Sequence, residues 1–342
     1  HYQRQDSGVK VLVTEPISDE GIGLLRSYAQ VDIKLGLKPE ELISIIGDYE
    51  ALVVRSQTQV SAEVIQAGQK LQVIGRVGVG IDNVDVDEAT RRGIVIVNAP
   101  TGNITSAAEH TIALMLSLAR NIPQANAMLR SGVWRREDFI GTEVRGKTLG
   151  IIGLGNVGSE VARRAQGLEM RLIAYDPLIS VDHATKLQVE LVPLKRLLKE
   201  SDFITLHLPL TESTRGLIGA KELALVKPTV RIINCARGGL INEQALARAV
   251  KERRVAGAAM DVFSTEPATG GALFDDDNII VTPHLGASTT EAQLTAARDI
   301  AEQIIDVFNG QPARYAVNAP FISAETLSVL APSIKLASTV GK

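Results

Sequence analysis

The chain is poor in features that would assign it to several large classes of protein. Its 342 residues include one cysteine, Cys235, so no disulfide can form within the chain, and we expect a reducing compartment, the cytoplasm. The formal net charge is −3, without the basic excess that favours nucleic-acid binding. The longest apolar stretches, such as residues 112–119, are far shorter than the roughly 20 residues of a membrane-spanning helix. No clustered cysteine and histidine spacing predicts a metal site.

The length of the chain favours two domains rather than a single core. Residues 1–8 are polar and carry no pattern, so the predicted fold starts at residue 9. From there to residue 100, short apolar runs alternate with segments of helical periodicity, one of which starts at Ser18, a suitable N-cap. Buried strands are predicted at residues 9–15, 31–36, 51–56, 71–77 and 94–100. This alternation predicts a parallel sheet with right-handed crossovers.

A glycine-rich fingerprint, KTLGIIGLGNVG at residues 147–158, lies between a predicted strand and a predicted helix. Gly153 permits the tight turn, Gly155 lets a pyrophosphate approach the backbone, and Gly158 lets the helix pack on the strand. The helix N-terminus offers N–H groups to the anion. The next strand ends at Asp176, whose carboxylate suits a ribose 2′-hydroxyl and repels a 2′-phosphate. We therefore expect NAD as the cofactor; the alternative is an ordinary glycine-rich βα turn.

The fingerprint begins a second series of alternating strands and helices, after a helical pattern at residues 101–120. Six strands are predicted, at residues 148–153, 170–176, 202–209, 230–238, 256–263 and 278–284. An amphipathic helix at 290–310, ending at Gly310, is placed to return to the first domain. The prediction is an α/β protein of two doubly wound parallel-sheet (Rossmann-like) domains. The substrate-binding, flavodoxin-like domain is discontinuous, at residues 9–100 and 290–318, and the NAD-binding domain covers 101–289.

Three reactive side chains follow predicted strands of the second domain, where open α/β sheets bind their ligands: Arg237, Glu266 and His284. A histidine can take the hydroxyl proton when a hydroxy acid is oxidised, and a neighbouring carboxylate stabilises the imidazolium. An arginine can hold the substrate carboxylate with its planar fork. Taken singly, each has a plainer interpretation, namely a surface ion-pair partner, an acid in a first helical turn and a polar loop residue.

Four motifs occur in a defined order: GLGNVG (153–158), NCARGG (234–239), DVFSTEP (261–267) and PHLGAST (283–289). In this order and spacing they resemble the D-2-hydroxyacid dehydrogenases, and the resemblance covers about residues 9–318. It implies that His284 is the acid–base catalyst, Glu266 its partner and Arg237 the anchor of the substrate carboxylate. The resemblance is greatest to members that oxidise a phosphorylated hydroxy acid, 3-phospho-D-glycerate, at the start of serine synthesis.

The resemblance also implies further contacts. Cofactor contacts are expected from Gly153, Gly155, Asn156, Val157, Gly158, Asp176, His207, Pro209, Cys235, Ala236, Asp261 and Gly286. Substrate contacts are expected from Arg55, Ser56, Gly78, Val79, Asn103 and Arg136. Plainer interpretations stay open for some of them: a simple turn at Gly78, a core histidine at His207 and a solvated basic loop at Arg136. Cys235 is interpreted as a packed small residue rather than a nucleophile, and His110 as a helix-packing or interface residue rather than a ligand.

In the family, a segment such as residues 120–145 wraps around a second subunit, so a homodimer or higher homo-oligomer is expected. Two other functions stay open. One is a different family member, such as a glyoxylate/hydroxypyruvate reductase, and the other is an NAD-sensing scaffold similar to the corepressors that keep the same three residues. Residues 319–342 resemble the start of an extension that leads, in longer members, to a serine-binding regulatory domain. Because that domain is missing from this sequence, we expect no serine feedback in this chain.

Overall fold

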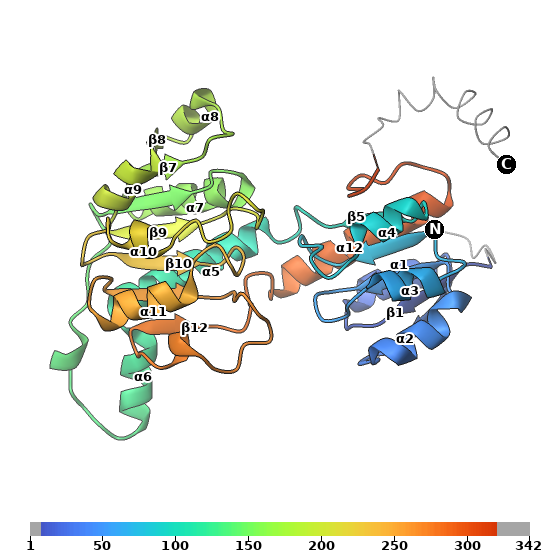
Figure 1. The fold of residues 1–342 in the computed structure, drawn as a ribbon, viewed down its shortest axis with the longest axis horizontal. Coiled ribbons are helices and arrows are strands. Elements are labelled where there is room, and N and C mark those ends of the chain that lie inside the picture. Colours follow the sequence, from blue (N-terminus) through green and yellow to red (C-terminus); the bar gives the residue numbers. More distant parts are fainter. Residues whose placement is uncertain (1–7, 320–342) are drawn as a thin grey trace. The chain divides into compact units, whose positions relative to one another are not determined.

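The computed structural model describes residues 8–319, which form two compact units (Figure 1). One unit contains the described residues up to Asn103 and from Thr289 onward, and the other is Ile104–Ser288. The chain therefore passes from one unit to the other twice, after Asn103 and after Ser288. The predicted division at residues 100 and 290 lies beside these two crossings. The expected C-terminal extension lies, apart from residue 319, outside the described residues.

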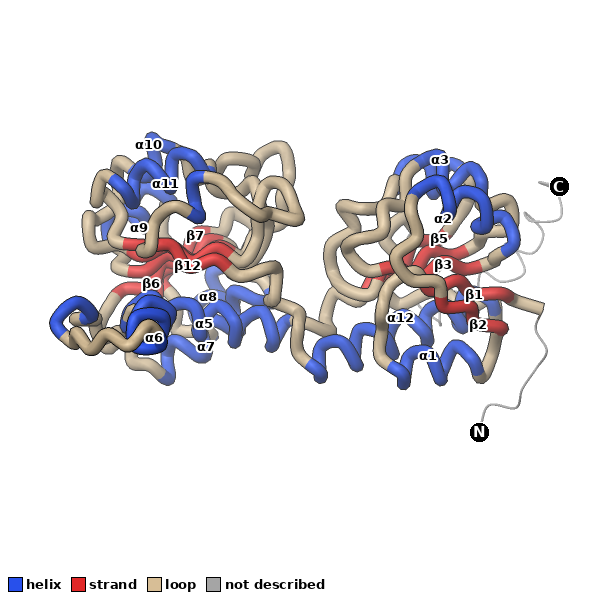
Figure 2. The backbone as a smooth tube through the Cα atoms, turned by 90° about the horizontal axis from the view of Figure 1, so that it is seen from below, coloured by secondary structure: helices blue, strands red, loops and turns tan. Residues whose placement is uncertain are grey.

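The first unit is a five-stranded parallel sheet with the strand order β2-β1-β3-β4-β5. Its strands are β1 (Lys10–Val13), β2 (Gln30–Ile33), β3 (Ala51–Val54), β4 (Val73–Arg76) and β5 (Val95–Asn98). One face is covered by α1 (Asp19–Arg26) and α12 (Thr290–Phe308). The other is covered by α2 (Pro39–Ile45), the 3-10 turn η1 (Ile46–Asp48), α3 (Ala62–Ala67) and α4 (Val86–Arg91). Figure 2 shows the sheet between these two layers.

Local sequence explains where these elements begin and end. The hydroxyl of Ser18 accepts the Gly21 N–H and caps α1, as expected. Pro39 occupies the first turn of α2, where its missing N–H costs nothing. The carboxylate of Asp85 accepts the Glu88 N–H at the start of α4. Helix α12 ends before Gly310, whose φ of 71° is one that glycine adopts without a steric penalty.

The segment after α12 covers the edge of the first sheet. Ala316 forms an antiparallel bridge with Val97 of β5. On either side of this bridge, the Asn98 N–H donates to the Tyr315 carbonyl at 3.3 Å, and the Val317 N–H donates to the Ile96 carbonyl at 2.8 Å. The amide of Gln303, which has no exposed surface, accepts the Tyr315 N–H at 2.8 Å. Unpaired strand edges can pair with other chains, so this segment protects β5.

The second unit is a seven-stranded parallel sheet with the order β12-β11-β10-β9-β6-β7-β8. Its strands are β6 (Thr148–Ile152), β7 (Arg171–Tyr175), β8 (Glu190–Leu191), β9 (Phe203–Leu206), β10 (Arg231–Asn234), β11 (Gly257–Met260) and β12 (Ile279–Val281). The expectation of six strands was wrong, because β8 has two residues and two residues carry no periodic pattern. The structure confirms the predicted α/β class with two parallel sheets.

Helices cover both faces of the second sheet as well (Figure 2). One face packs against α5 (Ile104–Arg120), α7 (Asn156–Gly167) and α8 (Val181–Lys186), and the other against α9 (Leu194–Glu200), α10 (Ala220–Leu223) and α11 (Glu243–Lys251). The turns η2 (Glu137–Phe139) and η3 (Ala272–Phe274) complete the unit. Helix α6 (Ile122–Arg130) buries no residue in this chain. Within residues 8–319, no helix is both long and apolar enough to cross a membrane.

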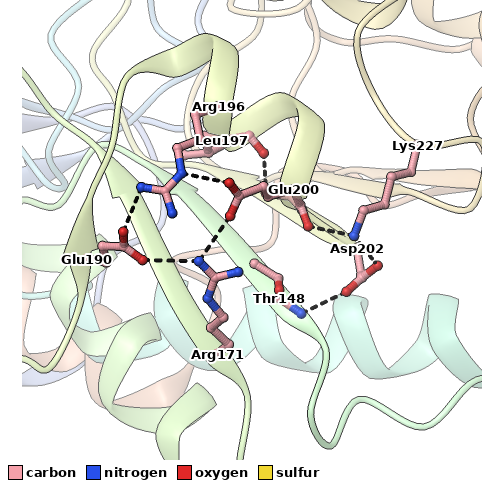
Figure 3. A network of polar contacts seen from close by, with 9 residues as sticks. Thr148, Arg171, Glu190, Arg196, Leu197, Glu200, Asp202 and Lys227 are labelled. Atoms are coloured by element: carbon pink, nitrogen blue, oxygen red, sulfur yellow. Dashed lines mark hydrogen bonds and ion pairs between the residues drawn. The ribbon is translucent and has the colours of Figure 1, made fainter.

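A polar network joins the amino ends of four strands of the second sheet, β6, β7, β8 and β9 (Figure 3). Arg171, the first residue of β7, contacts both Glu190 and Glu200, and Arg196 contacts the same two carboxylates at 2.6–2.7 Å. Before β9, the carboxylate of Asp202 accepts the Thr148 N–H and the Lys227 ammonium, each at 2.9 Å. These groups are largely exposed, so each pair contributes little alone. None of these residues lies at the carboxyl ends of the strands, at the opposite edge of the sheet.

Candidate functional site

Every ladder of the second sheet is parallel, so all its strands end at one edge. The predicted catalytic and cofactor residues follow these carboxyl ends. After β6 come Gly153, Gly155, Asn156, Val157 and Gly158; after β7, Asp176; after β9, His207 and Pro209; after β10, Cys235, Ala236 and Arg237; after β11, Asp261 and Glu266; after β12, His284 and Gly286. The structure therefore gathers the predicted set on the edge where such sheets bind ligands.

The glycine turn has the geometry that its sequence predicts. Gly153 has φ of 95°, and a Cβ there would lie 2.5 Å from the carbonyl oxygen of His207. A Cβ on Gly158 would collide with the Gly153 carbonyl, so no other residue lets α7 come this close to β6. Gly155, the N-cap of α7, is different, because a Cβ there would meet no atom within 4 Å. The space beside Gly155 is open, and the first N–H groups of α7 have no acceptor within the helix.

Asp176 is half-buried and holds the glycine turn by a hydrogen bond. Its Oδ2 accepts the Leu154 N–H at 2.8 Å, and its Oδ1 accepts the Leu178 N–H at 2.9 Å. An ionised carboxylate has about four acceptor positions, so each oxygen has one left for a hydroxyl group. Asp176 therefore holds the glycine turn and can still accept hydrogen bonds from a ribose.

His284 and Glu266 form the central pair of the site. The His284 Nδ1 lies 2.7 Å from the Glu266 Oε2, and the other carboxylate oxygen accepts the Phe263 N–H at 3.0 Å. Burial alone raises the pKa of Glu266, but the hydrogen bonds from His284 and Phe263 outweigh it and place the pKa below its ordinary value. His284 is 42% exposed, and Nδ1 is already engaged. Its Nε2 is therefore the nitrogen that can exchange a proton with a ligand.

A buried asparagine shapes the loop that carries Arg237. Asn234, at the end of β10, has no exposed surface; its Nδ2 donates to the Arg237 carbonyl at 2.9 Å and its Oδ1 accepts the Ala236 N–H at 3.1 Å. The Arg237 guanidinium donates to the Ala236 carbonyl at 2.7 Å. On the facing loop, Glu243 accepts the Ser264 N–H at 2.6 Å. Both loops are thus held by side chains outside the predicted set.

Asp261 is the most completely buried acid of the site. Its side chain has no exposed surface and accepts hydrogen bonds from the Thr282 hydroxyl at 2.6 Å, the Leu285 N–H at 2.7 Å and the Gly286 N–H at 2.8 Å. Its main-chain carbonyl accepts the His284 N–H at 2.9 Å. Burial raises the pKa of Asp261, but the hydrogen bonds from His110, Thr282 and Leu285 lower it by more. Asp261 is therefore an ionised centre around which the His284 loop is wrapped.

Among the described residues, one group has the side-chain types of a metal site: the ligand atoms of His110, Cys235 and Asp261 lie within 4.8 Å of one another. Two observations argue against a metal there. The Asp261 carboxylate is already occupied by hydrogen-bond donors. Burial raises the pKa of the Cys235 thiol to about 12 in the absence of a metal, so a metal would have to displace the thiol proton before it could bind. We interpret the cluster as a hydrogen-bonded support.

His207 follows β9 directly. Its Nε2 lies 3.0 Å from the Thr205 hydroxyl oxygen, with which it shares a hydrogen bond. Burial lowers the pKa of His207 to about 3, so its ring is neutral at physiological pH. Its main chain lines the glycine turn, because its N–H donates to Ile152 at 2.7 Å and its carbonyl faces Gly153. Through its main chain, His207 therefore contributes to the shape of the turn.

In the first unit, the loop with Arg55 and Ser56 follows β3. The Glu15 carboxylate, which is 5% exposed, accepts the N–H groups of Arg55 at 2.8 Å and Thr58 at 2.9 Å. From the other side, the Asn83 amide donates to the carbonyls of Arg55 at 2.9 Å and Thr58 at 2.7 Å. Glu15 and Asn83 thus form a rigid frame for the loop. Strands β1 and β3, which Glu15 and Arg55 follow, meet where the strand order reverses.

The other predicted substrate residues of the first unit lie near the same sheet edge. Gly78 follows β4 with φ of 138°, a conformation that favours glycine, and the Val79 carbonyl accepts the Asn98 amide at 2.7 Å. Asn103 is the last residue before the first crossing. After the turn at Gly78, Asp85 caps α4 and Asn83 holds the Arg55 loop.

Arg136 is exposed and lies in the segment between α6 and β6, whose course Figure 1 shows. It lines a depression with Trp134, Glu137 and Ile140. The Trp134 and Ile140 residues are 74% and 84% exposed. Such large exposed apolar side chains are typical of an interaction surface.

The site also depends on residues that the sequence did not indicate: Glu15, Asn234, Glu243 and Thr282. Glu15 and Glu243 accept backbone N–H groups of loops that are distant in sequence. Asn234 bonds the backbone of its own loop, and Thr282 donates to the Asp261 carboxylate. Only Asn234 had a signal, because it begins the NCARGG motif. The contacts of the other three form between segments that no local pattern links.

Comparison with known proteins gives consistent results. Residues 112–286 match the family model described as D-isomer specific 2-hydroxyacid dehydrogenase, NAD binding domain. The chain is 52% identical over 332 residues to the D-3-phosphoglycerate dehydrogenase of Synechocystis sp., covering 97% of this chain and 60% of that protein. It is 50% identical over 336 residues to the enzyme of that name from Archaeoglobus fulgidus, covering 98% and 64%. The chain thus spans about six-tenths of the length of these relatives.

The structure is similar to solved structures over nearly its whole length. The TT0316 protein from Thermus thermophilus superimposes with a TM-score of 0.84 at 30% identity, covering 90% of this chain and 100% of that one. The similarity therefore includes both units and not the matched domain alone.

Proposed function

Because this chain belongs to the D-isomer specific 2-hydroxyacid dehydrogenase family, we propose that it oxidises 3-phospho-D-glycerate to 3-phosphohydroxypyruvate with NAD, as the first step of phosphorylated serine synthesis. The observation that carries the chemistry is the 2.7 Å contact between His284 and Glu266, on the unit whose first strand ends in the glycine turn. The names of the relatives from Synechocystis and Archaeoglobus support the substrate.

The described residues fit an NAD molecule. The open space at Gly155 and the N–H groups at the start of α7 suit a pyrophosphate, and the remaining acceptor positions of Asp176 suit ribose hydroxyls. A carboxylate at that position repels the 2′-phosphate of NADP. When bound, NAD supplies the hydride acceptor, the C4 carbon of its nicotinamide ring. The neighbouring contacts proposed from the resemblance are Asn156, Val157, Pro209, Cys235, Ala236, Asp261 and Gly286.

The residues of this chain then perform the proton chemistry. The substrate hydroxyl gives its proton to the His284 Nε2 as its carbon loses hydride and the C=O bond forms. The Glu266 carboxylate, ionised because its pKa is lowered, stabilises the imidazolium through Nδ1. Arg237 holds the substrate carboxylate by a charge-assisted contact. In the reverse direction, the imidazolium returns the proton to the carbonyl oxygen.

Arg55 is the proposed contact for the phosphate, on the loop framed by Glu15 and Asn83, and Ser56, Gly78, Val79 and Asn103 complete the substrate set. We further propose a homodimer or higher homo-oligomer in the cytoplasm. The exposed apolar side chains around Trp134 support the interface, and the single cysteine with a protonated thiol suits a reducing compartment. In such an oligomer Arg136 would reach the substrate phosphate of a neighbouring subunit.

The first test measures NADH absorbance at mildly alkaline pH, with NAD and 3-phosphoglycerate beside lactate, glycerate and 2-hydroxyglutarate. A strong preference for 3-phosphoglycerate supports both the reaction and the phosphate site. Activity on unphosphorylated acids alone would move this chain to another member of the family, such as a glyoxylate/hydroxypyruvate reductase. Intact NAD binding without turnover of any hydroxy acid would favour an NAD-sensing scaffold.

A further inference from the structure

His110 lies on α5 and faces Asp261. Its Nε2 is 3.2 Å from the Asp261 Oδ1 and 3.4 Å from the Thr282 hydroxyl, and its side chain is 19% exposed. An ionised carboxylate only accepts hydrogen bonds, so Nε2 carries a proton. The Thr282 hydroxyl donates to the same oxygen at 2.6 Å. Both side-chain donors to Asp261 therefore converge on Oδ1.

Asp261 is also hydrogen-bonded to the loop that carries His284. Its two oxygens accept the N–H groups of Leu285 and Gly286, and its carbonyl accepts the N–H of His284 itself. His284 has φ of 55°, a left-handed conformation that is costly for a residue with a side chain. Such a conformation persists when the surrounding hydrogen bonds impose it. Here Asp261 provides three of those bonds, and the carbonyl of Thr282 accepts the His284 N–H as well, at 3.0 Å.

We propose that His110 is a positioning residue for the His284–Glu266 pair, acting through Asp261. His110 lies just after the first crossing of the chain, at Asn103, and His284 lies just before the second, at Ser288. The hydrogen bond to Asp261 thus connects the start of α5 with the end of the catalytic loop. Without this donor, Asp261 rotates more freely and the His284 Nε2 is less well aligned. This role extends the proposed function and rests on it.

The test compares His110→Leu, which removes the donor, with His110→Gln, whose amide nitrogen reaches about as far as the histidine Nε2. We expect kcat of His110→Leu to fall about tenfold, in the range of one lost hydrogen bond to a charged group. The KM for the hydroxy acid should change less than about twofold, because the contacts of His110 are with Asp261 and Thr282 and not with a proposed substrate residue. His110→Gln should recover kcat to within about threefold of the unsubstituted protein.

Hydrogen exchange gives a readout that does not depend on turnover. The Leu285 and Gly286 amides should lose protection in His110→Leu and keep it in His110→Gln. Thr282→Val removes the other side-chain donor and should act in the same direction, which provides the test if His110→Leu does not fold. Lys227→Met is the control, because it breaks the Asp202 contact at the far edge of the sheet and should change stability only slightly while kcat stays the same.

A folded His110→Leu with unchanged kcat and unchanged amide protection would overturn the proposal. So would a His110→Gln variant as slow as His110→Leu, since bulk rather than the hydrogen bond would then matter. The substrate is a separate question. If 3-phosphohydroxypyruvate is not reduced, the proposed function fails, and His110 is judged by the exchange data and by whichever 2-oxo acid is reduced.

Discussion

Gly238 lies against the carbonyl group of Phe263 so closely that a Cβ atom on Gly238 would collide with it. Gly238 follows Arg237, and the N–H of Phe263 is bound by the Glu266 carboxylate. The loop with the proposed substrate anchor and the loop with the acid partner of His284 are therefore in direct backbone contact. Their spacing is set by the absence of a side chain at Gly238.

Gly238→Ala should therefore separate these two loops. We expect the activity to fall about tenfold or more, because a misplaced anchor affects the transition state strongly. Unfolding by urea should show a loss of about 1–3 kcal/mol, the usual cost of overpacking. Gly23→Ala is the matched control, since a Cβ at Gly23 meets no atom within 4 Å and α1 gains helix propensity. An active and stable Gly238→Ala would show that the loops are more adaptable than their contact indicates.

His284→Ala should bind NAD normally and lose most turnover, about 100- to 10,000-fold, because it removes the proton acceptor. Glu266→Gln should keep the shape of the pair and lower kcat about a hundredfold, because the charge that stabilises the imidazolium is lost. Nucleotide binding by fluorescence and turnover by NADH absorbance check both variants. Turnover of His284→Ala at the unsubstituted rate would remove His284 from the role of base.

The neutral His207 should make stability depend on pH. Its folded-state pKa of about 3 lies below the ordinary value of about 6.5. Between these two pH values, the histidine is protonated in the unfolded chain and neutral in the folded chain. Stability is therefore lost as the pH falls below about 6.5, by at most about 1.4 kcal/mol per pH unit. His207→Gln should lack this component. Urea unfolding of both proteins at pH 7, 6 and 5 measures the difference, and parallel curves would contradict the assignment.

Asp176→Asn should change the choice of nucleotide. The amide keeps an acceptor for the Leu154 N–H but removes the charge that repels a 2′-phosphate. We expect the preference for NAD over NADP, measured as the ratio of kcat/KM values, to fall about tenfold. The cost to NAD alone should be smaller than the change in the ratio. An unaltered ratio would show that another group reads the 2′ position.

Arg55→Ala should raise KM for 3-phosphoglycerate about tenfold or more and affect lactate or glycerate far less, because it removes the charge proposed to bind the phosphate. Arg136→Ala gives the same pattern if it contributes to a neighbouring subunit's site. Arg91→Ala is a control, since its exposed guanidinium pairs with Glu88 on α4. Equal losses on phosphorylated and small acids would place Arg55 at the carboxylate instead.

Much of the fold followed from short-range patterns in the sequence. Most of the predicted buried strands, the Ser18 cap and Gly310 after α12 express local preferences of the chain, and the structure confirms them. The prediction of a buried strand at residues 31–36 was wrong, because β2 is an edge strand and none of its four residues is buried. Strand β8 was missed because its two residues show no alternation. The edge pairing of Ala316 with β5 was also beyond prediction, because it depends on two segments far apart in sequence.

The site divides in the same way. Arg237, Glu266 and His284 could be found because each follows a strand, and parallel strands end at one edge. Glu15 and Asn83 could not, because each works by binding backbone atoms of a loop about 30 to 40 residues away in sequence. The 2.7 Å pairing of His284 with Glu266 likewise needed the tertiary structure, although the motifs had brought both residues to attention.

The discontinuity of the first unit affects the order in which a ribosome can complete this protein. One face of its sheet is covered by α12, whose Ile300 and Ile304 are almost fully buried. Those residues are synthesised after the entire second unit. During synthesis, one apolar face of the first sheet therefore stays uncovered until the second unit has been made. Chaperones that bind nascent apolar surfaces can bind this face for that whole time.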